Sequence, residues 1–180
     1  MKANRYVAFL RAVNLGGRTV KMDQLRKLFT SMGYTGVETF IASGNVVFES
    51  AVTKTADLER QIEALLEKGF GFPIATFVRS FDELDAAAKY NPFKADTSAG
   101  ANLYVAFVRE TPSKAHERKL RALASEIDDF RVRGREVYWL RRGHFSDAPP
   151  PPIEKILDMP ATVRNSTTVR KIATKFGAGP

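Results

Sequence analysis

Residues 40–50 read FIASGNVVFES, two short apolar runs joined by Ser43, Gly44 and Asn45. A tight connection of this composition between β-rich runs predicts a β-hairpin. Gly44 supplies the positive φ angle that such a turn needs. Ser43 and Asn45 either hydrogen-bond the turn or present a hydroxyl and an amide to a ligand, and we favour the structural role.

The segments around this hairpin complete a folding unit. Residues 5–14 form an apolar run without a helical stripe, which is typical of a central strand. Apolar residues at helical spacing predict helices over 22–32 and 55–68, and residues 74–79 predict a further strand. The order β-α-β-β-α-β is that of a ferredoxin-like unit, which has a four-stranded antiparallel sheet with two helices on one face.

The second half of the chain repeats the first. Residues 104–109, YVAFVR, match residues 6–11, YVAFLR, at five of six positions, and such similarity indicates duplication. A hairpin around 134–135, a strand over 161–164 and a last helix from about 167 continue the pattern. We therefore predict an α+β fold of two tandem ferredoxin-like repeats with antiparallel sheets and a C-terminal helix. The predicted division is 1–80 for the first repeat, 81–101 for a helix and linker, and 102–180 for the second repeat with its C-terminal helix.

The composition excludes several classes of protein. The chain has 180 residues and no cysteine, which excludes disulfides and thiolate metal sites, and His116 and His144 are too far apart to suggest a metal site. No apolar run reaches the length of a membrane span, and the N-terminus lacks a signal-peptide core. We expect a cytoplasmic protein that holds no metal or cofactor and does not enter membranes.

The net charge of +8 is concentrated in two segments. Residues 131–142 and 161–180 each contribute +4, so an acidic partner should meet the second half. In 131–142, RVRGREVYWLRR, arginines alternate with aromatic and aliphatic residues, a combination that binds single-stranded nucleic acid. The candidate residues are Arg131, Arg133, Tyr138, Trp139, Arg141 and Arg142. The alternative is that both aromatic rings are core residues and the arginines form a solvated rim.

Four segments carry a family resemblance. They are 11–17 (RAVNLGG), 40–48 (FIASGNVVF), 91–93 (NPF) and 164–169 (RNSTTV). In this order they resemble the signature segments of the bacterial domain of unknown function 1697 family. The resemblance implies an intracellular bacterial protein with two ferredoxin-like repeats, and it implies no biochemical role.

The chain also departs from that family pattern. The family often has Gly at the position of Ala12, Gln at that of Ala42 and an aromatic residue near Ser166. It often has a Ser-Lys pair where this chain has the proline-rich residues 148–152. A site that used the Gln or the Ser-Lys pair would be altered or absent here.

Two loops are candidates for binding an anion, such as a phosphorylated small molecule. Residues 14–18 follow a strand and precede a helix, where glycines can free backbone N–H groups for an anion. Residues 164–168 have the same layout before a basic helix. The candidate residues are Arg11, Asn14, Gly16, Gly17, Ser43, Gly44, Asn45, Arg164, Asn165 and Lys171. The alternatives are a simple turn at 14–18 and helix capping at 166–167, and the loops would converge only if the repeats pack with twofold pseudosymmetry.

No catalytic residue stands out. The serines and histidines show no spacing that favours a triad, and the acidic residues of 59–67 suit a solvated helix face. Whether the protein is an enzyme stays open. A third alternative is a structural or regulatory homodimer without a ligand, because open sheets have edges that invite pairing.

Overall fold

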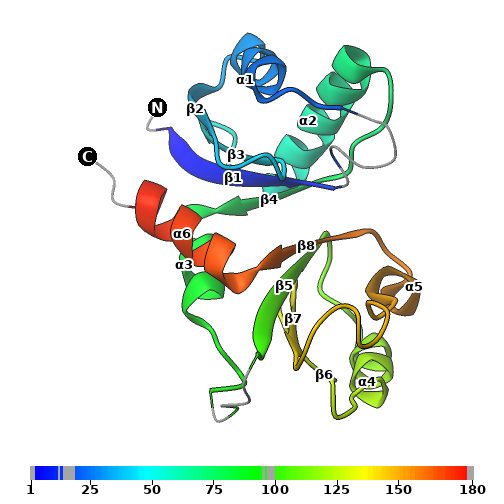
Figure 1. Cartoon of the computed structure of the whole chain (residues 1–180). Helices are drawn as coiled ribbons and strands as arrows, with labels where there is room; N and C mark the ends of the chain where they lie inside the picture. The colour runs from blue at the N-terminus through cyan, green and yellow to red at the C-terminus, as the bar shows by residue number, and fades with distance from the viewer. Residues whose placement is uncertain (1–2, 12, 14–18, 95, 97–99, 178–180) are drawn as a thin grey trace. The chain divides into compact units, whose positions relative to one another are not determined.

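The computed structural model of the protein describes residues 3–11, 13, 19–94, 96 and 100–177. The chain divides into two units (Figure 1). Unit 1 contains residues 1–85 and 172–180, and unit 2 contains residues 86–171. The boundaries fall inside helices α3 (Phe81–Lys89) and α6 (Ser166–Gly177), so each of these helices contributes to both units.

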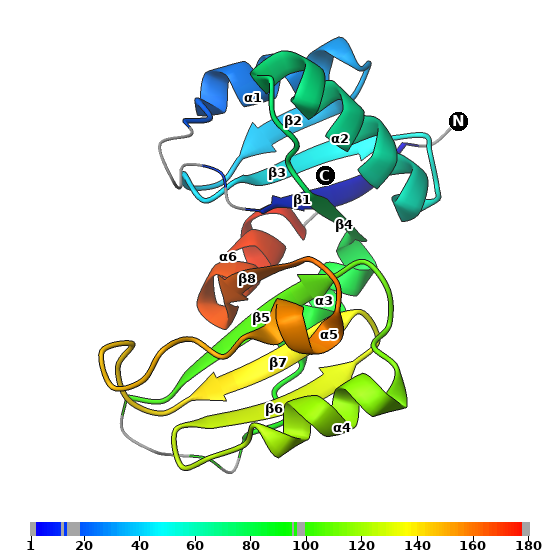
Figure 2. The same ribbon diagram turned by 90° about the vertical axis from the view of Figure 1, so that its right-hand side faces the viewer.

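Unit 1 is built on one antiparallel sheet. Its strands are β1 (Asn4–Leu10), β2 (Thr35–Thr39), β3 (Asn45–Ser50) and β4 (Thr76–Ser80), and its order is β2-β3-β1-β4. Helices α1 (Met22–Ser31) and α2 (Thr55–Phe70) lie on one face of this sheet (Figure 2). Strand β1 ends at Leu10 and is thus shorter than the predicted strand over 5–14. Strand β4 is followed directly by α3.

The core of unit 1 lies between the sheet and these two helices. Alternate residues of a strand share a face, so Ala8 and Leu10 of β1 point to the same buried layer. Phe48 of β3 joins them and contacts Phe29 of α1 edge-on, with ring centroids 5.4 Å apart. The apolar stripe of α2, including Leu58, covers the rest.

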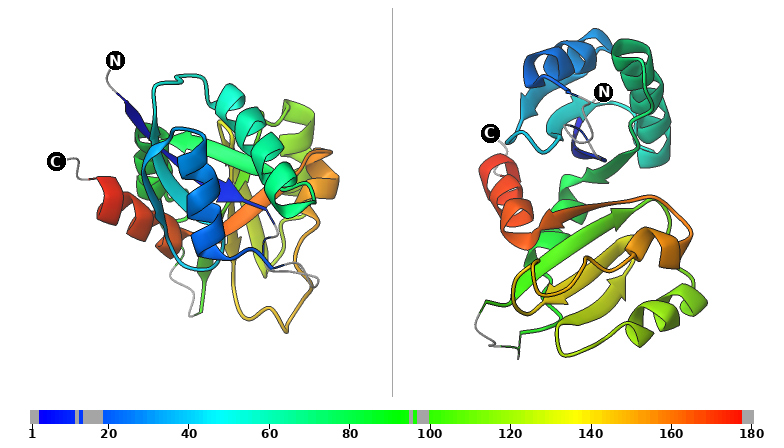
Figure 3. Two further views of the ribbon diagram at one scale, coloured as in Figure 1. Left: turned by 90° about the horizontal axis from the view of Figure 1, so that it is seen from above. Right: turned by 45° about the vertical axis from the view of Figure 1, so that its right-hand side comes forward.

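Unit 2 has the same strand arrangement. Its strands are β5 (Asn102–Val108), β6 (Asp128–Arg133), β7 (Glu136–Arg141) and β8 (Ala161–Asn165), in the order β6-β7-β5-β8. Helices α4 (Lys114–Ala122) and α5 (Ile153–Leu157) lie along one side of the sheet (Figure 3, right). The predicted α+β class with two four-stranded antiparallel sheets and a C-terminal helix is confirmed. The predicted domain boundaries stay a proposal.

Both faces of the sheet in unit 2 are covered. On one face, Val137 and Trp139 pack with the helices. On the other face, Tyr138 contacts Tyr90, with ring centroids 4.7 Å apart. This second face and the segment that follows Tyr90 form the surroundings of the candidate site.

The two sheets repeat each other in register. Val7 lies opposite Arg79, and Val105 lies opposite Arg164. One residue further, Tyr6 and Tyr104 lie opposite the last residue of β4 and of β8. The sequence match between 6–11 and 104–109 therefore corresponds to equivalent structural positions, as the predicted duplication requires.

Candidate anion-binding site

The first predicted anion loop is only partly described. Asn14, Gly16 and Gly17 lie outside the described residues. Arg11 is exposed, and its backbone N–H donates to the carbonyl of Ala75 at 2.9 Å. The involvement of this loop in a site stays a prediction.

The hairpin tip uses its polar groups within the turn. Asn45 is fully buried, and its Nδ2 donates to the carbonyl of Phe40 at 2.9 Å and to Ser43 Oγ at 2.8 Å. Gly44 has φ +76°, and its carbonyl accepts a hydrogen bond from the Leu10 N–H at 2.8 Å. These contacts are those expected for a structural role in the turn, and anion binding by Ser43, Gly44 and Asn45 stays a prediction.

Two of the residues predicted to stack on nucleic acid bases are core residues. Tyr138 is 1% exposed and Trp139 is 3% exposed. Trp139 Nε1 donates to Asp128 Oδ1 at 2.6 Å. The prediction that bases stack on these two rings is therefore wrong, because the sheet is covered on both faces and neither ring presents a free surface.

The arginines at the end of β7 are also engaged. Arg141 is 1% exposed; it lies 3.5 Å from Asp128 Oδ1 and donates to the carbonyl of Ala148. Arg142 forms an ion pair with Asp96, with 2.6 Å between Nε and Oδ2. Arg141 is thus a buried structural residue, so its predicted contact with nucleic acid is wrong.

Arg131 and Arg133 have a different environment. The Arg131 guanidinium lies over the ring of Phe93, 5.2 Å from the centroid, and that of Arg133 lies over Tyr90 at 4.5 Å. Arg131 also contacts Asp129 at 2.7 Å and keeps 40% of its side chain exposed. The two aromatic partners were not predicted from the sequence, although the NPF motif at 91–93 indicated that this segment matters.

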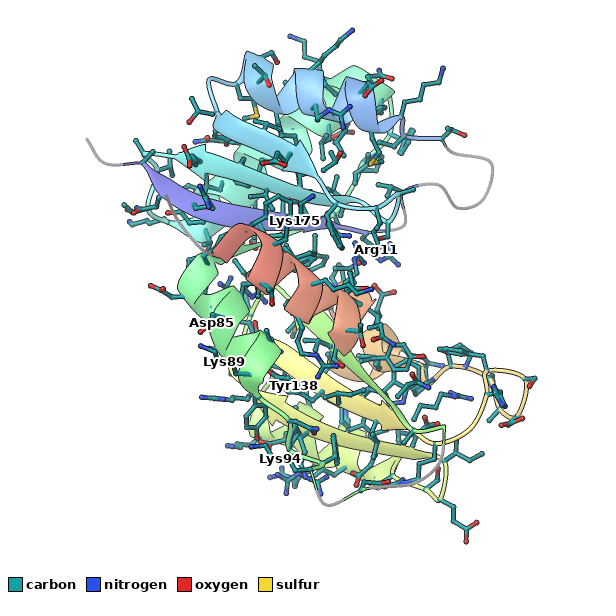
Figure 4. All side chains as sticks on the ribbon, turned by 60° about the vertical axis from the view of Figure 1, so that its left-hand side comes forward. Arg11, Asp85, Lys89, Lys94, Tyr138 and Lys175 are labelled. Atoms are coloured by element: carbon teal, nitrogen blue, oxygen red, sulfur yellow. The ribbon has the colours of Figure 1, made fainter. Side chains whose placement is uncertain are left out.

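Lysines lie in the same part of unit 2. Lys89, at the end of α3, and Lys94, in the segment after it, are exposed (Figure 4). Each lysine is the chain neighbour of a ring that carries an arginine, Tyr90 or Phe93, and the four cations Lys89, Lys94, Arg131 and Arg133 are here called the basic strip. Clustered cations of this kind attract phosphate groups.

A cavity of about 210 Å³ lies entirely within unit 2. It brings together the NPF segment, the start of β5, one residue of β7 and the first turn of α6. Its polar lining residues are Asn91, Asp96, Asn102, Asn165, Ser166, Thr167 and Arg170, and its apolar lining residues are Phe93, Ala101, Leu103 and Leu140. The cavity therefore joins two of the four family segments, 91–93 and 164–169.

The first turn of α6 gives this cavity a positive character. Asn165 Oδ1 accepts from the Thr167 N–H at 2.8 Å, and the first turn contains no acidic residue. Arg170 Nη2 contacts Thr167 Oγ1 at 3.3 Å. A helix N-terminus carries a partial positive charge, to which Arg170 adds a full one.

Arg164 places a second charge close by. It is 8% exposed, and its Nη1 donates to Thr162 Oγ1 at 2.8 Å and to the Val163 carbonyl at 3.0 Å. Burial lowers the pKa of the Arg164 guanidinium to about 10. Arg164 lies opposite Val105, two residues from the cavity-lining Leu103 on the same face of the sheet, but it is not itself a lining residue.

The equivalent helix of the first repeat is α3, and an acidic side chain offsets the positive charge at its N-terminus. The Ser80 N–H donates to Glu83 Oε2 at 2.9 Å, and the Glu83 N–H donates to Ser80 Oγ at 3.2 Å. This reciprocal capping box puts a carboxylate at the start of α3. Asn165 has the register position of Ser80, but the first turn of α6 contains no such acid.

The remaining predicted residue, Lys171, lies on the exposed surface of α6. Among the described residues, no cluster of three or more His, Cys, Asp or Glu could hold a metal ion. No helix in the described ranges is long and apolar enough to cross a membrane.

Comparison with known proteins agrees with the family resemblance. Residues 3–138 match the model of a family described as "Protein of unknown function (DUF1697)". The chain belongs to this family. No curated protein matches the chain.

A solved structure supports the architecture. The conserved bacterial protein SP0830 from Streptococcus pneumoniae is 23% identical and superimposes with a TM-score of 0.73. The match covers 98% of this chain and 99% of that one. At this identity the likeness concerns the fold alone.

Proposed function

We propose that this protein binds a phosphate-bearing ligand in the cavity at the first turn of α6. The observation that carries this proposal is the convergence of residues 91–93 and 165–170 on one polar cavity. The cavity adjoins a helix N-terminus without an acid of its own. Such an N-terminus binds anions through its N–H groups and its dipole.

The side chains support the same chemistry. Arg170 can donate charge-assisted hydrogen bonds to phosphate oxygens, and the amides of Asn91 and Asn102 can donate further ones. Asp96 would repel an anion, but its carboxylate is paired with Arg142. The balance of charge at the cavity therefore favours a negative group.

Thermal unfolding with small phosphates tests this proposal. We expect inorganic phosphate, ribose 5-phosphate or a nucleoside monophosphate to raise the melting temperature. A ligand at a hundredfold excess over its Kd adds about 2.7 kcal/mol to the free energy of unfolding. The variant Arg170→Ala should lose most of this stabilisation.

Arg118→Ala is the matched control, because Arg118 is an exposed arginine of α4, on the helix-covered side of the same unit. It makes the same change of charge and should bind the phosphates as the parent does. The proposal fails if no phosphate shifts the melting temperature, or if both variants lose the shift equally.

Nucleic acid binding is a second candidate, and it now depends on two arginines of β6 rather than on the two buried rings of β7. The supporting observation is that Arg131 and Arg133 carry exposed guanidinium groups over Phe93 and Tyr90. Such groups bind phosphates, and their outer faces can stack on bases.

The other predictions from the sequence are proposals as well. We propose that each unit is a ferredoxin-like repeat, supported by the element order β-α-β-β-α-β and by the position of the first strand between the third and the fourth.

Cytoplasmic location also stays a proposal. A homodimer stays a proposal too, and light scattering should show twice the chain mass; a strict monomer at high concentration would remove it.

A further inference from the structure

The size of the cavity limits what can enter it. Its volume of about 210 Å³ is below the roughly 300–1,000 Å³ that is usual for small-molecule pockets. A volume of this size suits a phosphate group with part of a sugar. The remainder of a larger ligand must lie outside, along the rim.

The rim leads directly to the basic strip. Phe93 lines the cavity, and the same ring carries the guanidinium of Arg131. Arg133 is two residues further on β6 and therefore shares the face of Arg131, about 7 Å along the strand. This spacing is comparable to the separation of successive phosphates in an extended single strand.

We propose that the cavity receives the terminal phosphate monoester of a single-stranded nucleic acid, whose following phosphates contact Arg131 and Arg133. This inference rests on the proposed function, because the same cavity holds the phosphate. A terminal monoester carries about −1.5 to −2 charges near neutral pH and has one ester link. An internal phosphodiester has two links, and both would have to leave so small a cavity.

Single strands suit the surface better than duplexes. The guanidinium planes over Phe93 and Tyr90 can stack on bases only when those bases are unpaired. The terminal phosphate can be at either the 5′ or the 3′ end, since both ends present the same monoester chemistry.

Fluorescence anisotropy with the full chain tests the proposal. Single-stranded oligonucleotides of about ten residues would cover a site of typical size. Three matched forms are compared, with a 5′-phosphate, with a 3′-phosphate, and with hydroxyls at both ends, the dye being attached away from the end under test. One phosphorylated form should bind about tenfold or more tightly than the hydroxyl form, through its added charge-assisted hydrogen bonds.

Two variants separate the cavity from the strip. Arg170→Ala should bring the affinity ratio of phosphate to hydroxyl ends close to one, while binding of the hydroxyl form persists. The double variant Arg131→Ala with Arg133→Ala should weaken both forms to a similar degree. It should also reduce the slope of log affinity against log salt by about 1.4, since two phosphate contacts are lost and each contributes about 0.7 on a single strand. Arg118→Ala should change neither quantity.

The outcomes distinguish this inference from the proposed function. Equal affinity for phosphate and hydroxyl ends overturns the inference, and the proposed function stands if ribose 5-phosphate still stabilises the parent but not Arg170→Ala. If the protein binds small phosphates but no oligonucleotide, the inference is likewise overturned and the proposed function stands. If the protein binds neither oligonucleotides nor small phosphates, the inference and the proposed function are both overturned. Circular dichroism melting curves of the exposed-arginine variants check that each is folded.

Discussion

Replacement of Arg141 by alanine is expected to lower the free energy of unfolding by about 3–5 kcal/mol, the usual cost of removing one partner of a buried ion pair. Arg141 lies 3.5 Å from Asp128 and donates to the carbonyls of Ala148 and Pro149. Its guanidinium also lies over the ring of Phe145, 4.9 Å from the centroid. The variant leaves a mostly buried carboxylate without its cation and releases the segment that the carbonyls anchor.

Arg142→Ala is the control for this variant. Arg142 is adjacent and equally charged, but its side chain is 27% exposed and its ion pair with Asp96 lies near solvent. Its loss should cost about 1 kcal/mol or less. Urea unfolding, followed by the fluorescence of Trp139, the single tryptophan, measures both values. Equal losses in the two variants would contradict the structural role given to Arg141.

The order of elements could be predicted because its signals are local. The helical spacing of apolar residues in 22–32 and 55–68 is satisfied by α1 and α2, whose apolar residues include Phe29 and Leu58. The match of 104–109 to 6–11 extended the same order to the second half, and β5 and β1 occupy equivalent positions. Local periodicity and duplication therefore sufficed for the fold class.

The environment of Tyr138 and Trp139 was harder to predict, because it depends on what covers each face of the sheet. Neighbouring residues of a strand point to opposite faces, so one of the two rings would normally be exposed. Here Tyr90 covers the second face as well. The run of apolar residues in β7, without polar alternation, is typical of a strand buried on both faces, which is the core alternative.

The cavity combines segments that the sequence analysis treated separately. Residues 164–168 were predicted as an anion site, but Asn91 was noted only within a motif, and Asn102 follows a stretch that resembled a linker. Only the pairing of β5 with β7 and β8 brings Asn102 next to the first turn of α6. Such long-range pairing has no signature in local periodicity.

The hairpin at 40–50 provides the second large expected effect. Gly44→Ala should lower the free energy of unfolding by about 2–5 kcal/mol, the sum of two costs. An L-residue at φ +76° pays about 1–2 kcal/mol for the left-handed conformation. The new Cβ would also lie 2.6 Å from Val13 Cγ2 and 3.1 Å from Leu10 Cβ, and overpacking of this kind adds about 1–3 kcal/mol.

Gly71→Ala isolates the first of these costs. Gly71 ends α2 with φ +79°, nearly the same angle, but a Cβ there would meet no atom within 4 Å. Its loss should therefore stay near 1–2 kcal/mol. The difference between the two variants, measured by urea unfolding, reports the close approach of the hairpin turn to Leu10 and Val13. If the two losses are equal, that packing does not stabilise the hairpin, and the positive φ alone explains why residue 44 is glycine.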